Sequence, residues 1–113
     1  MIVQDQTSVT DFLSRPETHD LEGSRVERID THISILFLAG ERVFKLKREV
    51  KFPYLDFSTI EKRKQACEAE VRINRRTAPD IYLGTRAVAK MPDGSLSLTD
   101  QGEVLDWLVE MKR

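Results

Sequence analysis

Two charged side chains lie in segments whose neighbours are apolar, and together they could bind a phosphate group. Lys45 belongs to residues 43–47, a predicted β-strand whose odd positions share one face and whose apolar even positions share the other. Glu70 belongs to a predicted helix over residues 59–76 and falls within the apolar arc of that helix. A carboxylate in a core-facing arc must be paired, because burying it alone is costly. A lysine held by this carboxylate could present its ammonium group to a phosphate.

Both residues also have purely structural interpretations. Lys45 could lie on the solvated face of a half-exposed sheet, and its spacing alone favours this interpretation. Glu70 could pair with any nearby arginine instead of a lysine. Lys47 lies on the same strand face as Lys45, about 6–7 Å further along, and therefore competes for the same carboxylate.

The elements that must position these residues can be read from apolar periodicity and turn residues. The predicted helices are residues 8–13 and 59–76, and the predicted strands are residues 26–29, 33–38, 43–47, 81–84, 85–89, 95–98 and 104–109. Pro16 should end the first helix, because the residue before a proline is pushed out of the helical region. This order predicts an α+β fold, with a mainly antiparallel sheet of about five strands and the long helix packed across it.

The long helix has the clearest local signal. Ser58 and Glu61 fit a capping box, in which each of the two side chains satisfies an orphan backbone amide. An apolar stripe that includes Cys67 and Val71 is widened by Ile73 on one side. This stripe should face the sheet, and Glu70, which lies within the apolar arc, should then face the sheet too.

Length and composition restrict the class of protein. The chain has 113 residues, enough for one domain, and its single cysteine allows neither an internal disulfide nor a cysteine zinc site. It shows neither an apolar run long enough to span a membrane nor a basic signal-peptide start. We therefore expect one cytoplasmic domain with no metal site of its own and no membrane partner. Residues 36–76 carry 11 basic and 6 acidic side chains between acidic ends, which could attract the phosphates of a nucleotide or a nucleic acid.

Several motifs together resemble one bacterial family. They are residues 31–34, 43–47, 52–59, 74–76 and 82–84. The strand with Lys45 and the helix with an inward Glu70 resemble the N-terminal lobe of the protein-kinase fold. More closely, the motifs resemble aminoglycoside-phosphotransferase-like proteins, which are commonly fused to a downstream P-loop ATP-binding domain. The resemblance covers essentially the whole chain. It implies that Lys45 binds the α- and β-phosphates of ATP and that Glu70 holds this lysine, as the two catalytic residues.

The resemblance also implies a set of residues around the nucleotide. They are Thr31, His32, Ser34, Val43, Lys45, Glu110 and Met111. The first three lie between two strands that would fold over the phosphates, although a Gly-x-Gly pattern is missing there. Val43 would floor the adenine pocket, and the backbone at Glu110 and Met111 would form the hinge beside the adenine. His32 could instead be a turn residue, and a strand-core role explains the hinge residues equally well.

The family pattern is incomplete in this chain. The sequence ends at Arg113, where a second lobe would begin, and it contains nothing similar to the catalytic-loop aspartate or to the asparagine and aspartate that bind magnesium. We therefore expect an ATP-binding N-terminal lobe of a small-molecule kinase, inactive by itself, whose magnesium ligands and hydroxyl acceptor site belong to the complete enzyme. Whether the chain is an enzyme in its own right stays open.

Two other functions remain as alternatives. The chain could be a non-catalytic interaction protein or a truncated product, whose apolar floor is covered by the missing lobe or by a protein partner. It could also bind nucleic acid through Lys62, Arg63, Lys64 and the arginines at 72, 75 and 76. We consider nucleic acid the weaker alternative, because glutamates interrupt this basic run and no aromatic platform accompanies it.

Overall fold

The computed structural model describes residues 6–21 and 25–113 of the chain. Its helices are α1 (Thr7–Ser14), the 3₁₀ helix η1 (Pro16–His19) and α2 (Ile60–Asn74). Its strands are β1 (Glu27–Asp30), β2 (Ser34–Ala39), β3 (Arg42–Lys47), β4 (Lys51–Phe52), β5 (Leu55–Asp56), β6 (Tyr82–Lys90), β7 (Leu96–Ser97) and β8 (Glu103–Lys112). Among these residues, no helix is both long and apolar enough to cross a membrane.

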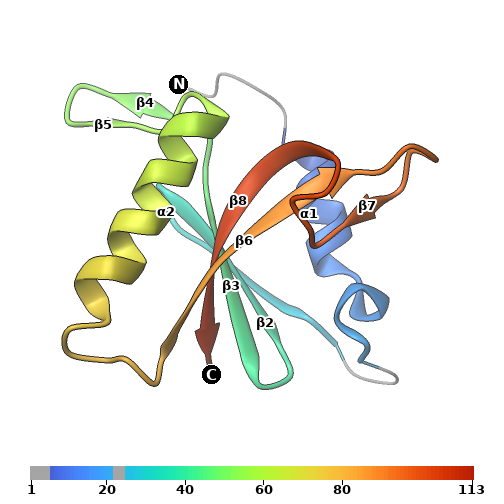
Figure 1. Ribbon diagram of the computed structural model, residues 1–113, viewed down its shortest axis with the longest axis horizontal. Coiled ribbons are helices and arrows are strands. Elements are labelled where there is room, and N and C mark those ends of the chain that lie inside the picture. Colours follow the sequence, from blue (N-terminus) through green and yellow to red (C-terminus); the bar gives the residue numbers. More distant parts are fainter. Residues whose placement is uncertain (1–5, 22–24) are drawn as a thin grey trace.

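A six-stranded antiparallel sheet in the order β1-β2-β3-β8-β6-β7 organises the fold, and α1 and α2 lie on either side of it (Figure 1). The α+β class and the antiparallel sheet are thus confirmed. The sheet has one strand more than expected, and β4 and β5 form a separate small hairpin. The predicted strands 81–84 and 85–89 are a single strand, β6, because a bulge between Tyr82 and Gly84 absorbs the irregularity without turning the chain.

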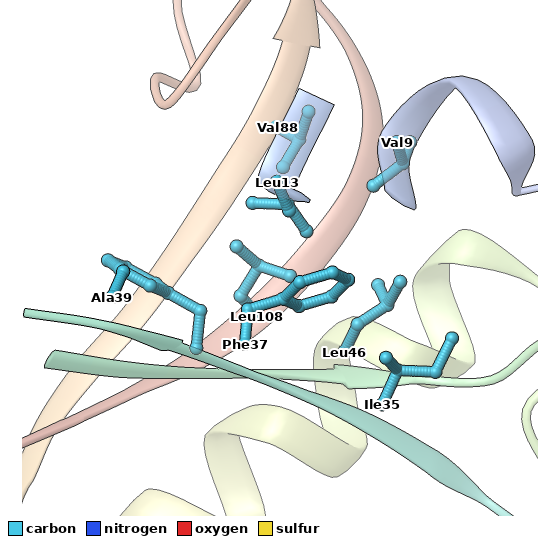
Figure 2. Close-up of a cluster of buried hydrophobic side chains, with 9 residues drawn as sticks. Val9, Leu13, Ile35, Phe37, Ala39, Leu46, Val88 and Leu108 are labelled. Atoms are coloured by element: carbon cyan, nitrogen blue, oxygen red, sulfur yellow. The ribbon is translucent and has the colours of Figure 1, made fainter. Parts of the chain in front are cut away.

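Helix α1 covers one face of the sheet with the larger hydrophobic core (Figure 2). Its buried residues are Val9, Leu13, Ile35, Phe37, Ala39, Phe44, Leu46, Val88 and Leu108. Each fully buried Leu or Phe side chain stabilises the fold by about 1.5–3 kcal/mol. Phe44 and Leu46 are the even positions of β3, so the odd positions, Lys45 and Lys47, face the opposite side of the sheet.

A proline determines where α1 ends, and side-chain hydrogen bonds determine where α2 begins. Helix α1 stops at Ser14, and Arg15 is extended (φ −84°, ψ 128°) before Pro16, as predicted. The N-cap of α2 is Thr59 rather than the predicted Ser58: the Thr59 hydroxyl accepts a hydrogen bond from the backbone N–H of Lys62 at 3.1 Å. Ser58 is unavailable for this role because its own N–H and hydroxyl both donate to Asp56, at 3.0 and 2.6 Å.

Helix α2 packs against β8 on the second face of the sheet. Cys67 and Val71 of the helix meet Val109 of β8 in a small buried cluster. The predicted stripe therefore faces the sheet at these two residues. Ile73 does not follow it, because its side chain is 55% exposed. From this side of the helix, Glu70 reaches Lys45 of β3 and Arg63 reaches Asp106 of β8.

Candidate functional site

Lys45, Lys47 and Glu70 form an ion cluster between β3 and α2. Lys45 Nζ donates to Glu70 Oε2 at 3.1 Å, and Lys47 Nζ donates to the other carboxylate oxygen, Oε1. The Lys45–Glu70 pair is therefore confirmed as a contact. Lys47, which the sequence made a competitor for the same carboxylate, instead shares it.

The strand register explains why the helix reaches these lysines. Lys45 lies opposite Val109 of β8, and Val109 packs directly against Val71 of α2. Glu70 precedes Val71 by one residue, so its side chain leaves the helix on the flank that faces β3. Strand alternation then brings both Lys45 and Lys47 to the same side of the sheet.

The cluster is half-buried and electrostatically unequal. The side chain of Glu70 is 13% exposed, that of Lys47 7% and that of Lys45 27%. Burial raises the pKa of the Glu70 carboxyl, but the hydrogen bonds and charges of Lys47 and Lys45 outweigh burial and lower that pKa overall. With two ammonium groups around one carboxylate, the cluster retains positive charge on the more exposed side of Lys45.

A second ion cluster lies on the same helix, two turns before the first. Arg63 Nε donates to Asp106 Oδ1 at 2.8 Å, and Arg63 Nη1 lies 3.3 Å from Glu49 Oε1 and donates to the Phe57 carbonyl at 2.8 Å. All three charged side chains are at most 1% exposed. Gln6, just before α1, donates to Asp106 at 2.6 Å. This cluster joins four separate segments of the chain, which indicates a structural role.

The sequence analysis did not identify the Arg63 cluster, although one signal was available. Arg63 precedes Cys67 by four residues and Val71 by eight, so it lies on the same buried stripe. Burial raises the pKa of Asp106, and Arg63 only partly offsets it; the same holds for Glu49. A charged residue on an apolar stripe implies buried partners, yet local spacing does not say where in the chain those partners lie.

Cys67 lies between the two clusters and is sealed from solvent. Its side chain has no exposed surface, and its thiol donates to the Trp107 carbonyl at 3.8 Å. Burial raises the pKa of this thiol to about 12. Burial and the raised pKa both keep this thiol in its unreactive, uncharged form at neutral pH. Within the described ranges, the structure contains no group of acidic, histidine or cysteine residues that could hold a metal ion.

Of the residues predicted to lie near the phosphates, one faces the ion cluster and the others form the neighbouring turn. Ser34 is paired with Lys47 across β2 and β3, so its buried side chain shares the face of the ion cluster. Thr31 closes the turn into β2: its N–H and its hydroxyl both donate to the Ser34 carbonyl, at 2.8 and 3.0 Å. His32, the next residue in this turn, is exposed.

The residues predicted to surround the adenine lie at the other end of β3. Val43 is paired with Met111 of β8, and both share the sheet face of Lys45. The Glu110 side chain points to the opposite face, where it lies 3.5 Å from Arg42 and 3.4 Å from Arg86. Only the backbone of Glu110 can therefore meet a ligand on the Lys45 face.

The basic run of α2 does not form one exposed face. Arg63 is buried, Lys62 pairs with Asp56 at 2.5 Å, and Lys64 lies over the Trp107 ring at 5.0 Å. Farther along, Arg75 Nε donates to the Tyr82 carbonyl at 2.8 Å. These contacts direct the four cations in different directions, whereas Arg72 and Arg76 are exposed.

A groove of about 880 Å³ lies on the α1 side of the sheet. It is lined by α1 and η1 on one side and by β7 and Arg86 on the other. Arg86 already contacts Glu110 and donates to the Leu98 carbonyl at 3.3 Å. The groove thus also contains an exposed cation beside a carboxylate, but its Arg86–Glu110 pair joins two strands of the sheet, whereas the Lys45–Glu70 pair joins a strand to a helix.

Comparison with known proteins gives few relatives. Neither a family model nor a solved structure matches the chain. Uncharacterized proteins of Mycobacterium bovis and of two strains of Mycobacterium tuberculosis are each 41% identical to it over 66 residues. The match covers 58% of this chain but only 13% of each relative. The chain therefore resembles one segment of much longer mycobacterial proteins.

Proposed function

We propose that this chain is the ATP-binding N-terminal lobe of a kinase of the aminoglycoside-phosphotransferase-like family. Lys45 binds the α- and β-phosphates, and Glu70 holds its ammonium group in place. The observation that supports this role most directly is the 3.1 Å contact between Lys45 Nζ and Glu70 Oε2, which joins the third strand to the long helix. The remaining exposure of Lys45 leaves room for a phosphate oxygen beside it.

The nucleotide would lie along β3, on the face that the ion cluster occupies. Val43 and Met111, paired at one end of this face, are suited to the flat apolar surface of an adenine. Ser34 is paired with Lys47 at the other end, where the phosphates would lie. Thr31 and His32 contribute the turn beside them, and Glu110 contributes its backbone to the hinge.

A second lobe or a protein partner would complete the site from the end of the sheet where β8 finishes. Here Lys112 N–H donates to the Ile81 carbonyl at 2.8 Å, and the side chains of Ile81 and Ile73 are 48% and 55% exposed. These apolar side chains favour a covered end. The magnesium ligands, the catalytic base and the acceptor site belong to that second lobe in the proposed enzyme, which would use cytoplasmic ATP.

Titration of the chain with ATP, followed by the amide signals in NMR, tests the binding site. We expect shifts at Val43, Lys45 and Glu70, and we expect Lys45→Met to weaken binding about tenfold or more, since it removes a hydrogen bond between charged groups. Lys90→Met is the matched control, because Lys90 is an exposed lysine of another strand. Shifts confined to the α1 groove, or equal binding by both variants, would contradict the proposal.

A turnover assay tests whether catalysis requires the second lobe. The chain alone should release no ADP from ATP above background, because the proposal assigns magnesium binding and the catalytic base to the second lobe. In a protein that carries both lobes, Lys45→Met should lower turnover by orders of magnitude, whereas Glu68→Gln should leave it nearly unchanged. Turnover by the isolated chain would overturn this assignment.

A further inference from the structure

The two lysines around Glu70 are not equivalent. Lys47 is the more deeply buried, with a side chain 7% exposed against 27% for Lys45. Its ammonium group lies 5.6 Å from the centre of the Phe57 ring, a cation–π contact that holds it in addition to Glu70. Lys45 has no aromatic partner among those recorded for the described residues. The side chain of Lys47 is therefore the better anchored of the two.

Each oxygen of the Glu70 carboxylate receives one lysine. Oε1 accepts from Lys47 and Oε2 accepts from Lys45. Lys47 therefore keeps Oε1 paired whatever Lys45 also contacts. Without Lys47, the position and charge of Glu70 would depend on Lys45 alone, and a carboxylate left unpaired at 13% exposure carries a desolvation cost.

We propose that Lys47 is a positioning residue that holds Glu70 independently of Lys45, so that Glu70 stays in place to hold Lys45 while Lys45 binds a phosphate. This inference rests on the proposed function only in the identity of the phosphate ligand. The anchoring of Glu70 by Lys47 is a property of the chain without any nucleotide. Lys47 acts through Glu70 and does not itself touch the ligand.

The groups facing Glu70 are consistent with this division. Lys45 and Lys47 face it from β3, and Cys67 lies beside it on its own helix; Asp106 of β8 also acts on that thiol. Lys47 does more than Lys45 to lower the pKa of Glu70. The ionisation of Glu70 therefore depends on its own burial, which disfavours it, and on the two lysines, which outweigh burial.

Lysine-selective NMR of the unaltered chain gives the first test. An ammonium group held by a buried partner exchanges its protons slowly, so we expect a resolved Nζ–H signal for Lys47 and none, or a much weaker one, for Lys45. The Lys47 signal should remain the stronger of the two when ATP or inorganic pyrophosphate is added. A persistent Lys45 signal with no Lys47 signal would overturn the proposal, and this measurement does not depend on whether any variant folds.

Titration of the Glu70 carboxyl by ¹³C NMR gives the second test. In Lys47→Met the pKa of Glu70 should rise toward or above the ordinary glutamate range, whereas Lys45→Met should raise it less. Lys47→Arg, which restores a cation, should bring the pKa back down. An equal or larger rise in Lys45→Met would show that Lys45, not Lys47, holds the carboxylate.

Binding of ATP separates this inference from the proposed function. If the wild-type chain binds ATP, Lys47→Met should weaken binding about tenfold, most strongly at acidic pH where its Glu70 is protonated, and Lys47→Arg should recover most of the loss. Unchanged ATP binding by Lys47→Met would contradict a positioning role. If the wild-type chain does not bind ATP, the proposed nucleotide site fails, while the two NMR measurements still decide whether Lys47 anchors Glu70.

Discussion

Helix α2 carries two ion clusters on one flank, and their construction is opposite in both charge and burial. Around Arg63, two carboxyl groups surround one guanidinium, and each of the three side chains is at most 1% exposed. Around Glu70, two ammonium groups surround one carboxylate, and the side chain of Lys45 is 27% exposed. One cluster is sealed and rich in carboxyl groups; the other is partly open and rich in cations.

The difference distinguishes a structural role from the binding role that we propose for the open cluster. A sealed cluster can stabilise or specify the fold but cannot reach a ligand, and burial raises the pKa of its Asp106 and Glu49. An open cluster with spare positive charge can accept an anion at little structural cost. Because both clusters lie on the same helix, the Arg63 cluster fixes the position from which Glu70 reaches β3.

The largest expected effect is on the sealed cluster. Arg63→Ala leaves the carboxyl groups of Asp106 and Glu49 without their buried cation, so we expect the free energy of unfolding to fall by about 3–5 kcal/mol. Urea denaturation at neutral pH measures the loss. Arg72→Ala, an exposed arginine of the same helix, should change stability by no more than about 0.5 kcal/mol. Similar small losses in both variants would show that the Arg63 cluster does not hold the helix.

Patterns within single elements predicted much of the open cluster. The alternation of β3 indicated that Lys45 and Lys47 share a face, and the arc of α2 indicated that Glu70 faces inward. The structure confirms both placements and the contact between Lys45 and Glu70. Local patterns could not determine which of the two lysines pairs with Glu70, because each oxygen of the carboxylate can accept a hydrogen bond from one lysine.

The same kind of pattern did not predict the sealed cluster, and the reason is physical. Hydrophobicity placed Ile73 inside the arc, and Arg63 was considered only as part of a basic run, yet Ile73 is 55% exposed and Arg63 is fully buried. Burial of Arg63 depends on Glu49, before the β4–β5 hairpin, and on Asp106 of β8, 43 residues away from Arg63 in sequence. Such long-range charge compensation leaves no periodic signal. The N-cap of α2 is Thr59 rather than Ser58 for a local reason, because Asp56, two residues before Ser58, accepts hydrogen bonds from its N–H and its hydroxyl.

The open cluster should respond to pH in a way that the sealed cluster does not. Glu70→Gln removes a charged acceptor from two lysines, so we expect a loss of about 1.5–3 kcal/mol at pH 7, measured by urea denaturation. The folded-state pKa of Glu70 lies below its unfolded value. Its contribution is therefore complete above the unfolded pKa of about 4.3 and disappears as the pH falls through the folded pKa.

The difference in stability between wild type and Glu70→Gln should consequently shrink in acid. For Asp106 and Glu49, whose folded pKa values are raised, the sign is reversed: their ionisation costs stability as the pH rises through those values. Glu68→Gln, which changes an exposed carboxylate of α2, is the control and should cost no more than about 0.5 kcal/mol. A loss in Glu70→Gln that stays constant from pH 7 to pH 3 would mean that the charge of Glu70 is not what stabilises the fold.

The smallest expected change in stability concerns the residue with the largest proposed role. Lys45 is the more exposed of the two lysines, and in its absence Glu70 keeps Lys47, so Lys45→Met should lower the free energy of unfolding by no more than about 1 kcal/mol. Lys47→Met should cost more, about 1.5–3 kcal/mol, because it removes a buried hydrogen bond between charged groups and the contact with Phe57. Thermal and urea denaturation of the two variants, side by side, measures the ranking. Equal losses would mean that both lysines serve the fold alike, and the open cluster would then be structural, as the sealed cluster is. A stable Lys45→Met chain that no longer binds ATP would instead show that this lysine is kept for its ligand.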